Sequence, residues 1–255
     1  MHCLWLECGS GEKELLLAGL YGHSTLGVTE HDLPGGRVKL QAFFDGPLDL
    51  DDWSTYAPRW ETVQFDARWQ PPEPLLVGER WFLVPEGRDD ATPAGRLRLP
   101  VHLGMASGSG YHAPTQLALE ALEQTLLATD DFLDVGAGTG ILCHAAALLG
   151  CCRRVGCDID SDAVAVARRT GVPAEMFVGS PRSLRAKSFD AIAANLNAET
   201  LLGLRHELLR VLRPGGRLIL SGFQHHRADA VTVAFELPVR QMFAQDRWRC
   251  AVLSA

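Results

Sequence analysis

The chain has 255 residues, of which 47% are apolar and 22% charged, and its formal net charge is −7. This length allows one large buried core, or one large and one small core. The excess of acid argues against a general nucleic-acid binder, because affinity for a phosphate backbone depends on clustered positive charge. A net negative charge is compatible with a basic protein partner or a small ligand. It could also serve only to keep the protein soluble.

The seven cysteines and the start of the chain indicate the compartment. The cysteine number is odd, no pair has C-x-x-C spacing, and several cysteines stand inside apolar runs. We therefore expect buried, reduced thiols and neither disulfides nor a zinc site. Residues 1–8 lack the basic and long apolar stretches of a signal peptide, and no segment reaches the ~18 apolar residues of a membrane span. We expect a soluble, cytoplasmic protein without a membrane or metal partner.

The first 56 residues are expected to form a small α+β domain. Apolar residues at 4–8 predict a strand, and the leucine-rich stretch 12–21 predicts a helix. Strands at 25–29 and 38–44 flank a turn that contains Pro34 and two glycines. This β-α-β-β order is typical of one helix packed on a small sheet.

Prolines concentrate in the next stretch, residues 57–74, which we assign to an interdomain linker. Pro71, Pro72 and Pro74 each fix φ and remove a hydrogen-bond donor, so this part should be extended and semi-rigid. Domain motion about the linker is a hypothesis that rests on its proline content. The remaining residues, 75–255, are assigned to one larger domain.

The larger domain begins with a predicted hairpin, because residues 81–84 and 96–100 are apolar and flank a polar loop. Strands that then alternate with helices indicate βαβ units on a parallel sheet. The apolar stretches 239–243 and 248–254 predict an antiparallel pair at the edge of this sheet. The fold class is therefore α/β, a Rossmann-like doubly wound sheet with an antiparallel edge. Expected strands lie at 132–135, 154–158, 175–178, 189–195 and 217–221, and expected helices at 115–127, 141–149, 162–169 and 200–212.

A glycine-rich loop follows the first of these strands. Residues 134–140 have the sequence D-V-G-A-G-T-G, in which glycine occupies every second position before a helix begins. Glycine lets the backbone approach a ligand closely, and a helix N-terminus offers free N–H groups. The nicotinamide fingerprint G-x-G-x-x-G is excluded, because its third glycine would fall on Ile141 or Cys143.

Asp158 stands at the end of the next strand, twenty residues after Gly138. An acid at this point can accept hydrogen bonds from both hydroxyls of a ribose, whichever nucleoside is bound. The alternative for Asp158 is a solvated strand end, and Asp160 or Asp162 could simply cap the following helix. The distance from the glycine loop favours the ligand role for Asp158.

The pattern D-x-G-x-G-x-G resembles that of S-adenosylmethionine-dependent methyltransferases. In those enzymes the end of the third strand, here residues 177–180, places groups around the adenine. A turn such as residues 212–217 commonly precedes a later strand in them. The resemblance implies S-adenosylmethionine as the cofactor.

A longer stretch resembles one family among these enzymes. Residues 103–115 are similar to the G-x-A-F-G-T-G-x-H-x-T-T segment of ribosomal protein L11 methyltransferases of the PrmA type. Trp69, Pro74, Trp81 and the strand at 190–195 match that family as well. The resemblance extends over residues 60–255 and reaches the first 50 residues only in layout. It implies an N-terminal ferredoxin-like domain that recognises the substrate.

The resemblance also implies the site residues. Thr115 matches a threonine that contacts the cofactor, and Asn195 matches the asparagine beside the methyl group. Asn195 is the catalytic candidate, because an amide at the carboxyl end of a parallel strand lies where α/β sheets bind ligands. Its alternatives are a helix cap or a turn residue. The expected cofactor contacts are Thr115, Gly136, Gly138, Gly140, Asp158, Ile159, Ser180 and Asn195.

The chain departs from the family pattern at three places. S-G-S-G replaces F-G-T-G at residues 107–110, Pro114 replaces the first threonine, and L-N-A-E follows Asn195. These changes are compatible with cofactor binding and leave the protein substrate open. Enzymes that methylate amino groups of adenine or glutamine share an Asn/Asp-Pro-Pro-aromatic run, and its absence after Asn195 argues against those substrates.

We therefore predict an S-adenosylmethionine-dependent protein methyltransferase. It would transfer methyl groups to lysine side chains or the N-terminal amine of a ribosomal protein of the large subunit. The expected partner is this basic protein, and we expect a monomer without direct nucleic-acid binding. The alternatives are a diverged methyltransferase for another protein or a small molecule, and a non-catalytic S-adenosylmethionine-binding module.

Overall fold

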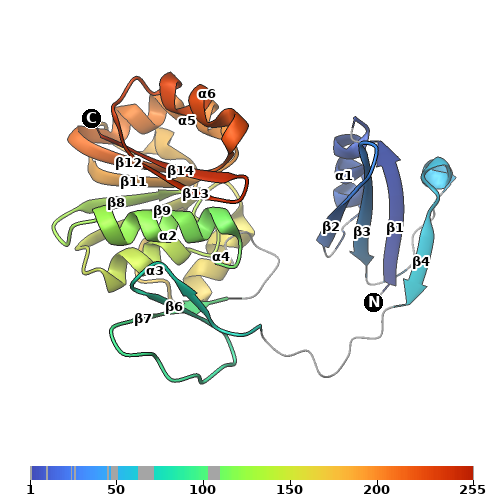
Figure 1. The fold of residues 1–255 in the computed structure, drawn as a ribbon, viewed down its shortest axis with the longest axis horizontal. Coiled ribbons are helices and arrows are strands. Elements are labelled where there is room, and N and C mark those ends of the chain that lie inside the picture. Colours follow the sequence, from blue (N-terminus) through green and yellow to red (C-terminus); the bar gives the residue numbers. More distant parts are fainter. Residues whose placement is uncertain are drawn as a thin grey trace. The chain divides into compact units, whose positions relative to one another are not determined.

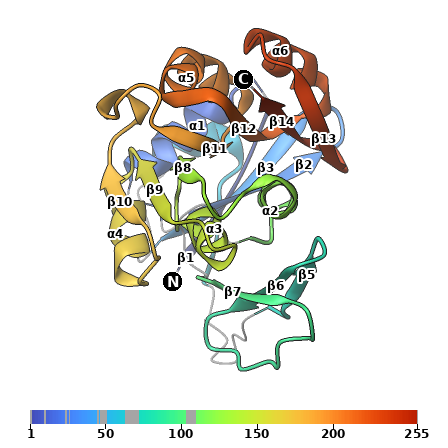
Figure 2. The ribbon, with the colours of Figure 1, turned by 90° about the vertical axis from the view of Figure 1, so that its left-hand side faces the viewer.

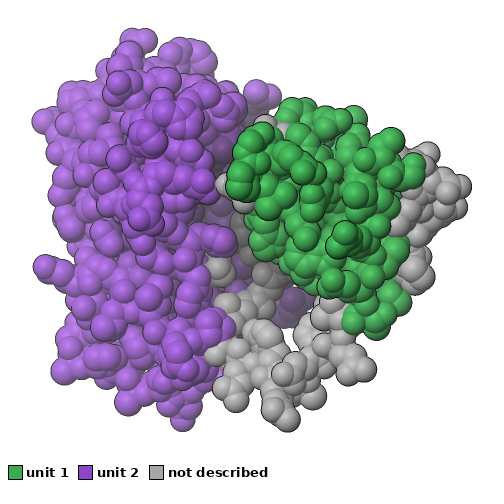
Figure 3. Space-filling model, turned by 45° about the vertical axis from the view of Figure 1, so that its right-hand side comes forward, with its two compact units in different colours: residues 1–70 green, residues 71–255 purple. Residues whose placement is uncertain are grey.

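The structure is a computed structural model, which describes residues 2–9, 11–23, 25, 27–44, 46, 51–62, 72–102 and 110–254. The chain forms two compact units, residues 1–70 and 71–255 (Figure 3), which are described separately. Trp69 and Pro71 of the expected linker lie outside the described residues, as does the segment 103–109 of the family-like stretch.

Among its described residues, the first unit has a four-stranded antiparallel sheet in the order β2-β3-β1-β4 and a ten-residue α-helix (Figure 1). Alternate residues of the central strands face the helix, since Leu4 and Leu6 are fully buried and pack in one cluster with Leu16 and Leu20. The elements are β1 (His2–Gly9), α1 (Lys13–Gly22), β2 (Gly27–Leu33), β3 (Arg37–Phe44), the 3-10 helix η1 (Asp51–Tyr56) and β4 (Arg59–Thr62).

Strand β4 moves the expected boundary of this unit. Its residues Arg59 and Trp60 pair with Trp5 and Leu4 of β1, so they extend the first sheet. The linker that we expected to begin at residue 57 therefore includes a strand of the first unit. Pro58 precedes this strand, where its missing N–H disrupts no ladder.

The second unit begins with a three-stranded sheet that corrects the predicted hairpin. Its strands are β5 (Leu75–Val77), β6 (Trp81–Pro85) and β7 (Leu97–Val101). β5 is antiparallel to β6, but β6 and β7 run parallel, with Trp81 opposite Leu97. The loop between β6 and β7 is long enough to return to the start of β6, as a parallel connection requires. Arg96 fixes this return, because its guanidinium donates to the carbonyl oxygens of Val77 and Gly78 at 3.3 and 2.7 Å.

The rest of the second unit is a seven-stranded sheet in the order β10-β9-β8-β11-β12-β14-β13. The first five strands in this order are parallel, and β14 is antiparallel to both of its neighbours. Its strands are β8 (Asp131–Val135), β9 (Arg153–Asp158), β10 (Glu175–Val178), β11 (Phe189–Asn195), β12 (Leu212–Gln224), β13 (Val239–Gln245) and β14 (Trp248–Ser254). The prediction of a mostly parallel sheet with an antiparallel edge is confirmed.

Helices cover both faces of this sheet (Figures 1 and 2). One face packs in a cluster with α2, α3 and α4, and the other packs in a cluster with α5 and α6. Successive residues of a strand belong to opposite clusters, as Phe132 and Leu133 of β8 do. The helices are α2 (Ala113–Thr125), α3 (Ile141–Leu148), α4 (Ser161–Arg169), α5 (Ala198–Val211) and α6 (Ala228–Ala234), with 3-10 helices η2 (Pro181–Ser183) and η3 (His225–Arg227). No helix in the described stretches is long and apolar enough to span a membrane.

The expected turn at residues 212–217 lies inside a strand. Leu212 pairs with Phe189 and Arg217 pairs with Ala191, so residues 213–216 form a bulge within β12. Gly215 has φ of 79°, a left-handed conformation that glycine adopts without strain. The pairing on both sides of the bulge explains why the strand is longer than predicted.

Candidate active site

The carboxyl ends of three parallel strands meet at one edge of the large sheet. Val135, the last residue of β8, lies opposite Cys157 of β9 and Ala194 of β11. The next residue on each chain segment is therefore Gly136, Asp158 or Asn195. The fold brings together three expected site residues that are far apart in the sequence.

The glycine loop folds back on the end of β9. Gly136, Gly138 and Gly140 all have positive φ, at 70°, 53° and 80°. The N–H groups of Gly136 and Ala137 donate to the carbonyl oxygen of Cys157 at 2.9 and 3.1 Å. These bonds hold the start of the loop against β9, so that the loop backbone forms a concave surface beside Asp158.

Gly136 also requires its hydrogen side chain because of crowding. A Cβ atom at this position would lie 2.4 Å from Cδ2 of Leu196, which follows Asn195. This is closer than real Cβ contacts allow, so any larger residue must displace the Leu196 side chain. The glycine thus serves two needs, a left-handed backbone and room beside the β11–α5 loop.

Asp158 is held in a fixed orientation by two backbone groups. Its Oδ2 accepts a hydrogen bond from the N–H of Gly138 at 2.8 Å, and its Oδ1 accepts one from the N–H of Asp160 at 3.0 Å. Each carboxylate oxygen has a second lone pair. The carboxylate can therefore accept two further hydrogen bonds from a pair of vicinal hydroxyls.

A cavity of about 560 Å³ opens at this edge, large enough for a nucleoside with an attached side chain. Six of the eight expected cofactor contacts line it, namely Gly136, Gly138, Asp158, Ile159, Ser180 and Asn195. Ile159 is 83% exposed and presents an apolar surface at the cavity. Ser180 is the N-cap residue of η2 but makes no side-chain cap bond, so its hydroxyl is not used by that helix.

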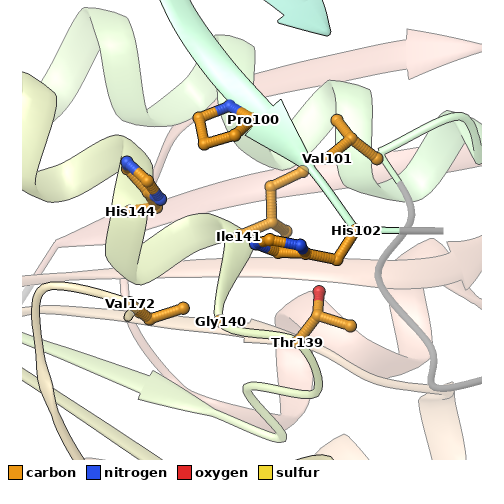
Figure 4. A pocket seen from close by; sticks show the side chains of 8 residues that line it. All are labelled: Pro100, Val101, His102, Thr139, Gly140, Ile141, His144 and Val172. Atoms are coloured by element: carbon orange, nitrogen blue, oxygen red, sulfur yellow. The ribbon is translucent and has the colours of Figure 1, made fainter. Parts of the chain in front are cut away.

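Gly140 lies on the other side of the loop. It lines a separate, smaller hollow together with His102, Thr139, His144 and Val172 (Figure 4). A Cβ atom on Gly140 would lie 2.9 Å from Cγ1 of Val172. The glycine at this position is explained by its left-handed φ at the N-cap of α3 and by packing against Val172.

Thr115 lies behind Asn195. It is 2% exposed, and its Oγ1 accepts a hydrogen bond from Nδ2 of Asn195 at 3.1 Å. The preceding residue is also fixed, because Ser221 Oγ donates to the carbonyl oxygen of Pro114 at 2.7 Å. Thr115 is therefore placed to orient the Asn195 amide, with the Asn195 oxygen left as an acceptor.

The capping alternative for Asn195 is not supported. The N-cap of α5 is Asn197, whose Oδ1 accepts from the N–H of Thr200 at 2.8 Å. Asp160 does cap α4, since its side chain accepts from the N–H of Asp162. The interpretation of Asp160 as a helix cap is therefore confirmed, whereas Asn195 does not cap α5.

Several lining residues were not predicted. Pro181 comes from η2, and Leu196, Asn197, Thr200 and Leu204 come from the β11–α5 loop and α5. Thr200 and Leu204 are four residues apart, a spacing that places both on one face of a helix. The spacing predicts that both side chains lie on the same face of the helix, but it does not predict that this face borders the cavity.

Asp134, the first residue of the glycine motif, is buried beneath the loop at 1% exposure. Burial raises the pKa of Asp134 to about 7, and the nearby charge of Asp158 adds to the rise. The thiol and backbone of Cys143 in α3 hydrogen-bond the Asp134 carboxyl group and oppose the rise. The Oδ2 atom of Asp134 has no hydrogen-bond partner.

All seven cysteines are free, and burial raises the pKa of the Cys157 and Cys250 thiols to about 12. No group of three or more metal-ligating side chains occurs among the described residues. The arrangement around the cavity can bind, orient and desolvate a ligand through hydrogen bonds and packing.

A mostly parallel seven-stranded sheet of this order, with a glycine loop after β8 and an acid after β9, defines the fold of the class I S-adenosylmethionine-dependent methyltransferases. The family model for ribosomal protein L11 methyltransferase (PrmA) matches residues 57–255. The chain belongs to this family.

Relatives carry the same family name. The chain is 39% identical over 189 residues to a ribosomal protein L11 methyltransferase of Geobacter metallireducens, covering 71% of this chain and 62% of the relative. It is 35% identical over 232 residues to that of Halorhodospira halophila, covering 82% and 78%. A crystal structure of a ribosomal protein L11 methylase from Lactobacillus delbrueckii subsp. bulgaricus superposes with a TM-score of 0.66 at 26% identity, covering 72% of this chain and 98% of that one. The match with the Geobacter protein thus spans about three fifths of that relative.

Proposed function

We propose that this protein is an S-adenosylmethionine-dependent methyltransferase that methylates amino groups of ribosomal protein L11. The observation that carries the proposal is the cavity at the sheet edge. Gly136, Gly138, Asp158 and Asn195 line it together, and the Asp158 carboxylate is held by the Gly138 N–H at 2.8 Å. Membership of the PrmA family supports the reaction and the substrate.

The residues present fit this cofactor. The cavity volume of about 560 Å³ suits a nucleoside joined to an amino acid. Asp158 would hold the ribose hydroxyls with its free lone pairs, and Ile159 and Ser180 would contact the base. Gly136 and Gly138 would border the amino-acid part, since both line the cavity. A side chain at Gly136 would also collide with Leu196.

When bound, S-adenosylmethionine supplies an electrophilic methyl group on a sulfonium centre. The task of the chain is then proximity and alignment of an amine nucleophile. A lysine amine must lose its proton before it can attack, and its ordinary pKa is ~10.4. Removing the amine from water in the cavity lowers that pKa, because desolvation disfavours the charged form.

Asn195 would orient the amine. Its amide nitrogen donates to Thr115 at 3.1 Å, which leaves the amide oxygen to accept from an N–H of the substrate. Holding the amide in one orientation keeps the acceptor toward the cavity without an entropy cost at binding. Thr115 is in this view a positioning residue that acts through Asn195.

The first unit would bind the protein substrate. Residues 1–70 contain 11 of the 31 acidic residues but only 5 of the 24 basic ones, so the excess negative charge is concentrated there. Ribosomal proteins are generally basic, and opposite charge speeds association with them. The seven free cysteines suit the reducing environment of the cytoplasm, where ribosomes are assembled.

The experiment is transfer of tritiated methyl groups from S-adenosylmethionine to purified ribosomal protein L11. We expect label in L11 with the wild-type protein and a rate that falls about tenfold or more with Asn195→Ala, since an orienting hydrogen bond in the transition state is lost. A second basic ribosomal protein serves as the control substrate. Label that appears only in other proteins, or none at all with cofactor bound, would overturn the substrate assignment.

A further inference from the structure

One wall of the cavity is a short segment with little support of its own. Gly179, Ser180 and Pro181 line the cavity where the edge strand β10 gives way to η2. Within the segment, the N–H of Ser183 donates to the carbonyl oxygen of Ser180 at 3.2 Å, and that of Leu184 donates to Pro181 at 3.0 Å. A single 3-10 turn after a four-residue edge strand holds the backbone of this wall only weakly, because such turns have poor hydrogen-bond geometry.

The start of this segment is anchored to the nucleoside end of the site. The N–H of Gly179 donates to the carbonyl oxygen of Asp158 at 2.7 Å. The backbone of the residue whose carboxylate faces the cavity therefore also holds the first residue of the wall. The opposite end of the segment needs a second anchor to fix the distance across the cavity.

Arg210 of α5 supplies that anchor. Its Nη1 donates to the carbonyl oxygen of Leu184 at 2.9 Å, and its Nη2 donates to Pro181 at 2.9 Å and Arg182 at 3.4 Å. Its Nε donates to Oε2 of Glu207 at 2.8 Å, one turn earlier in the same helix. All three guanidinium nitrogens are used. The rigid planar fork directs these donors at separate acceptors, whereas the three donors of a lysine ammonium share one nitrogen.

The same helix also lines the cavity. Thr200 and Leu204, in the first half of α5, line it together with Pro181. α5 thus lines the site directly and, through Arg210, also supports the Ser180–Pro181 wall. A shift of η2 away from α5 would widen the cavity between Ser180 and Leu204.

We propose that Arg210 is a positioning residue for cofactor binding, which sets the place of the Ser180–Pro181 wall by clamping η2 to α5. The inference rests on the proposed cofactor site. Arg210 does not line the cavity, so its effect passes through backbone carbonyl groups. The role concerns the nucleoside end of the site, beside Asp158, and not the amine end beside Asn195.

The test compares Arg210→Gln with Arg205→Gln. Arg205 lies on the same helix and also donates to a backbone carbonyl, that of Ala234 at 2.8 Å, but on the side of α6. Calorimetric titration with S-adenosylhomocysteine gives the Kd, and methyl-transfer kinetics give kcat and the KM for the cofactor. Arg210→Lys keeps the charge while removing the fork.

We expect Arg210→Gln to raise both the Kd and the cofactor KM about tenfold, since hydrogen bonds from a charged donor are lost, with kcat at saturating cofactor within about twofold. Arg210→Lys should fall between Arg210→Gln and wild type, and Arg205→Gln should bind as wild type does. Should Arg210→Gln fail to fold, as judged by circular dichroism, Arg210→Lys carries the test.

Wild-type binding by the Arg210 variants, or an equal loss in Arg205→Gln, overturns the positioning role. A fall in kcat with an unchanged Kd also overturns it, because the clamp would then act on the amine end. If the wild-type protein itself binds no S-adenosylhomocysteine, the proposed function fails before this inference is reached. The two failures are therefore distinguishable in one experiment.

Discussion

Replacing Asp134 by asparagine should remove a pH-dependent loss in the free energy of unfolding of the second unit. Asp134 is 1% exposed, and burial raises its pKa from 3.8 to about 7. A carboxyl group with a higher pKa in the folded state takes up a proton on folding. Its contribution is therefore most favourable below pH 3.8 and is lost as pH rises toward 7. Asparagine has the same shape and no charge at any pH.

The magnitude follows from the two pKa values. Each pKa unit corresponds to ~1.36 kcal/mol, so a rise from 3.8 to about 7 corresponds to roughly 4 kcal/mol. The free energy of unfolding of Asp134→Asn, relative to wild type, should therefore increase by roughly this amount between pH 4 and pH 8. Most of the change should occur between pH 4 and pH 7, and none above pH 8.

The assay is hydrogen–deuterium exchange of peptides from β8 and α3, which reports on the second unit separately from the first. Rates measured across pH 4–8 are corrected for the intrinsic pH dependence of exchange. Asp162→Asn is the matched control, because it removes the same charge from the exposed first turn of α4. If the difference between Asp134→Asn and wild type stays constant with pH, or if Asp162→Asn shows an equal slope, Asp134 is not the source of the pH dependence.

Three further changes follow from buried contacts. Thr115→Val keeps the shape but removes the acceptor of the Asn195 amide, so kcat should fall about tenfold with the cofactor Kd within twofold, measured by methyl transfer and calorimetry. Gly156→Ala puts a Cβ 2.4 Å from Sδ of Met176 and 3.1 Å from Sγ of Cys143, which should cost about 1–3 kcal/mol in chemical denaturation and be partly relieved by Met176→Val. Trp81→Phe removes the indole N–H that donates to a backbone carbonyl of α2 at 2.9 Å, which should cost about 1–3 kcal/mol in the same assay.

The periodicity of the chain was sufficient to predict most of the large sheet. Its strands are apolar runs bounded by glycine or polar turns, and β10 and β11 begin and end where the pattern predicts. Pairing direction is different, because it depends on contacts made far along the chain. The apolar pattern predicts the strands β6 and β7 but not their relative direction. They are parallel because the loop between them, held by Arg96, runs back to the start of β6.

Some features of the site could likewise be predicted from the sequence, and others could not. Glycine spacing and the acid at Asp158 predict a ligand edge, because they reflect backbone geometry that is local to each strand end. The separation of Gly140 from the cavity could not be predicted, since it depends on which side of the loop Val172 occupies. The contact of Thr115 with Asn195 joins residues 80 positions apart and is visible only in the folded chain.

Calorimetric titration of S-adenosylmethionine into matched glycine variants decides whether the cavity beside Gly136 and Asp158 binds the cofactor. Gly136→Ala and Gly171→Ala both force alanine into a left-handed φ, but only the first places a Cβ against Leu196, whereas Gly171 faces open space. We predict that wild type and Gly171→Ala bind the cofactor and that Gly136→Ala and Asp158→Ala lose at least about tenfold in affinity. Equal affinity in all four proteins would show that the cofactor does not bind in this cavity.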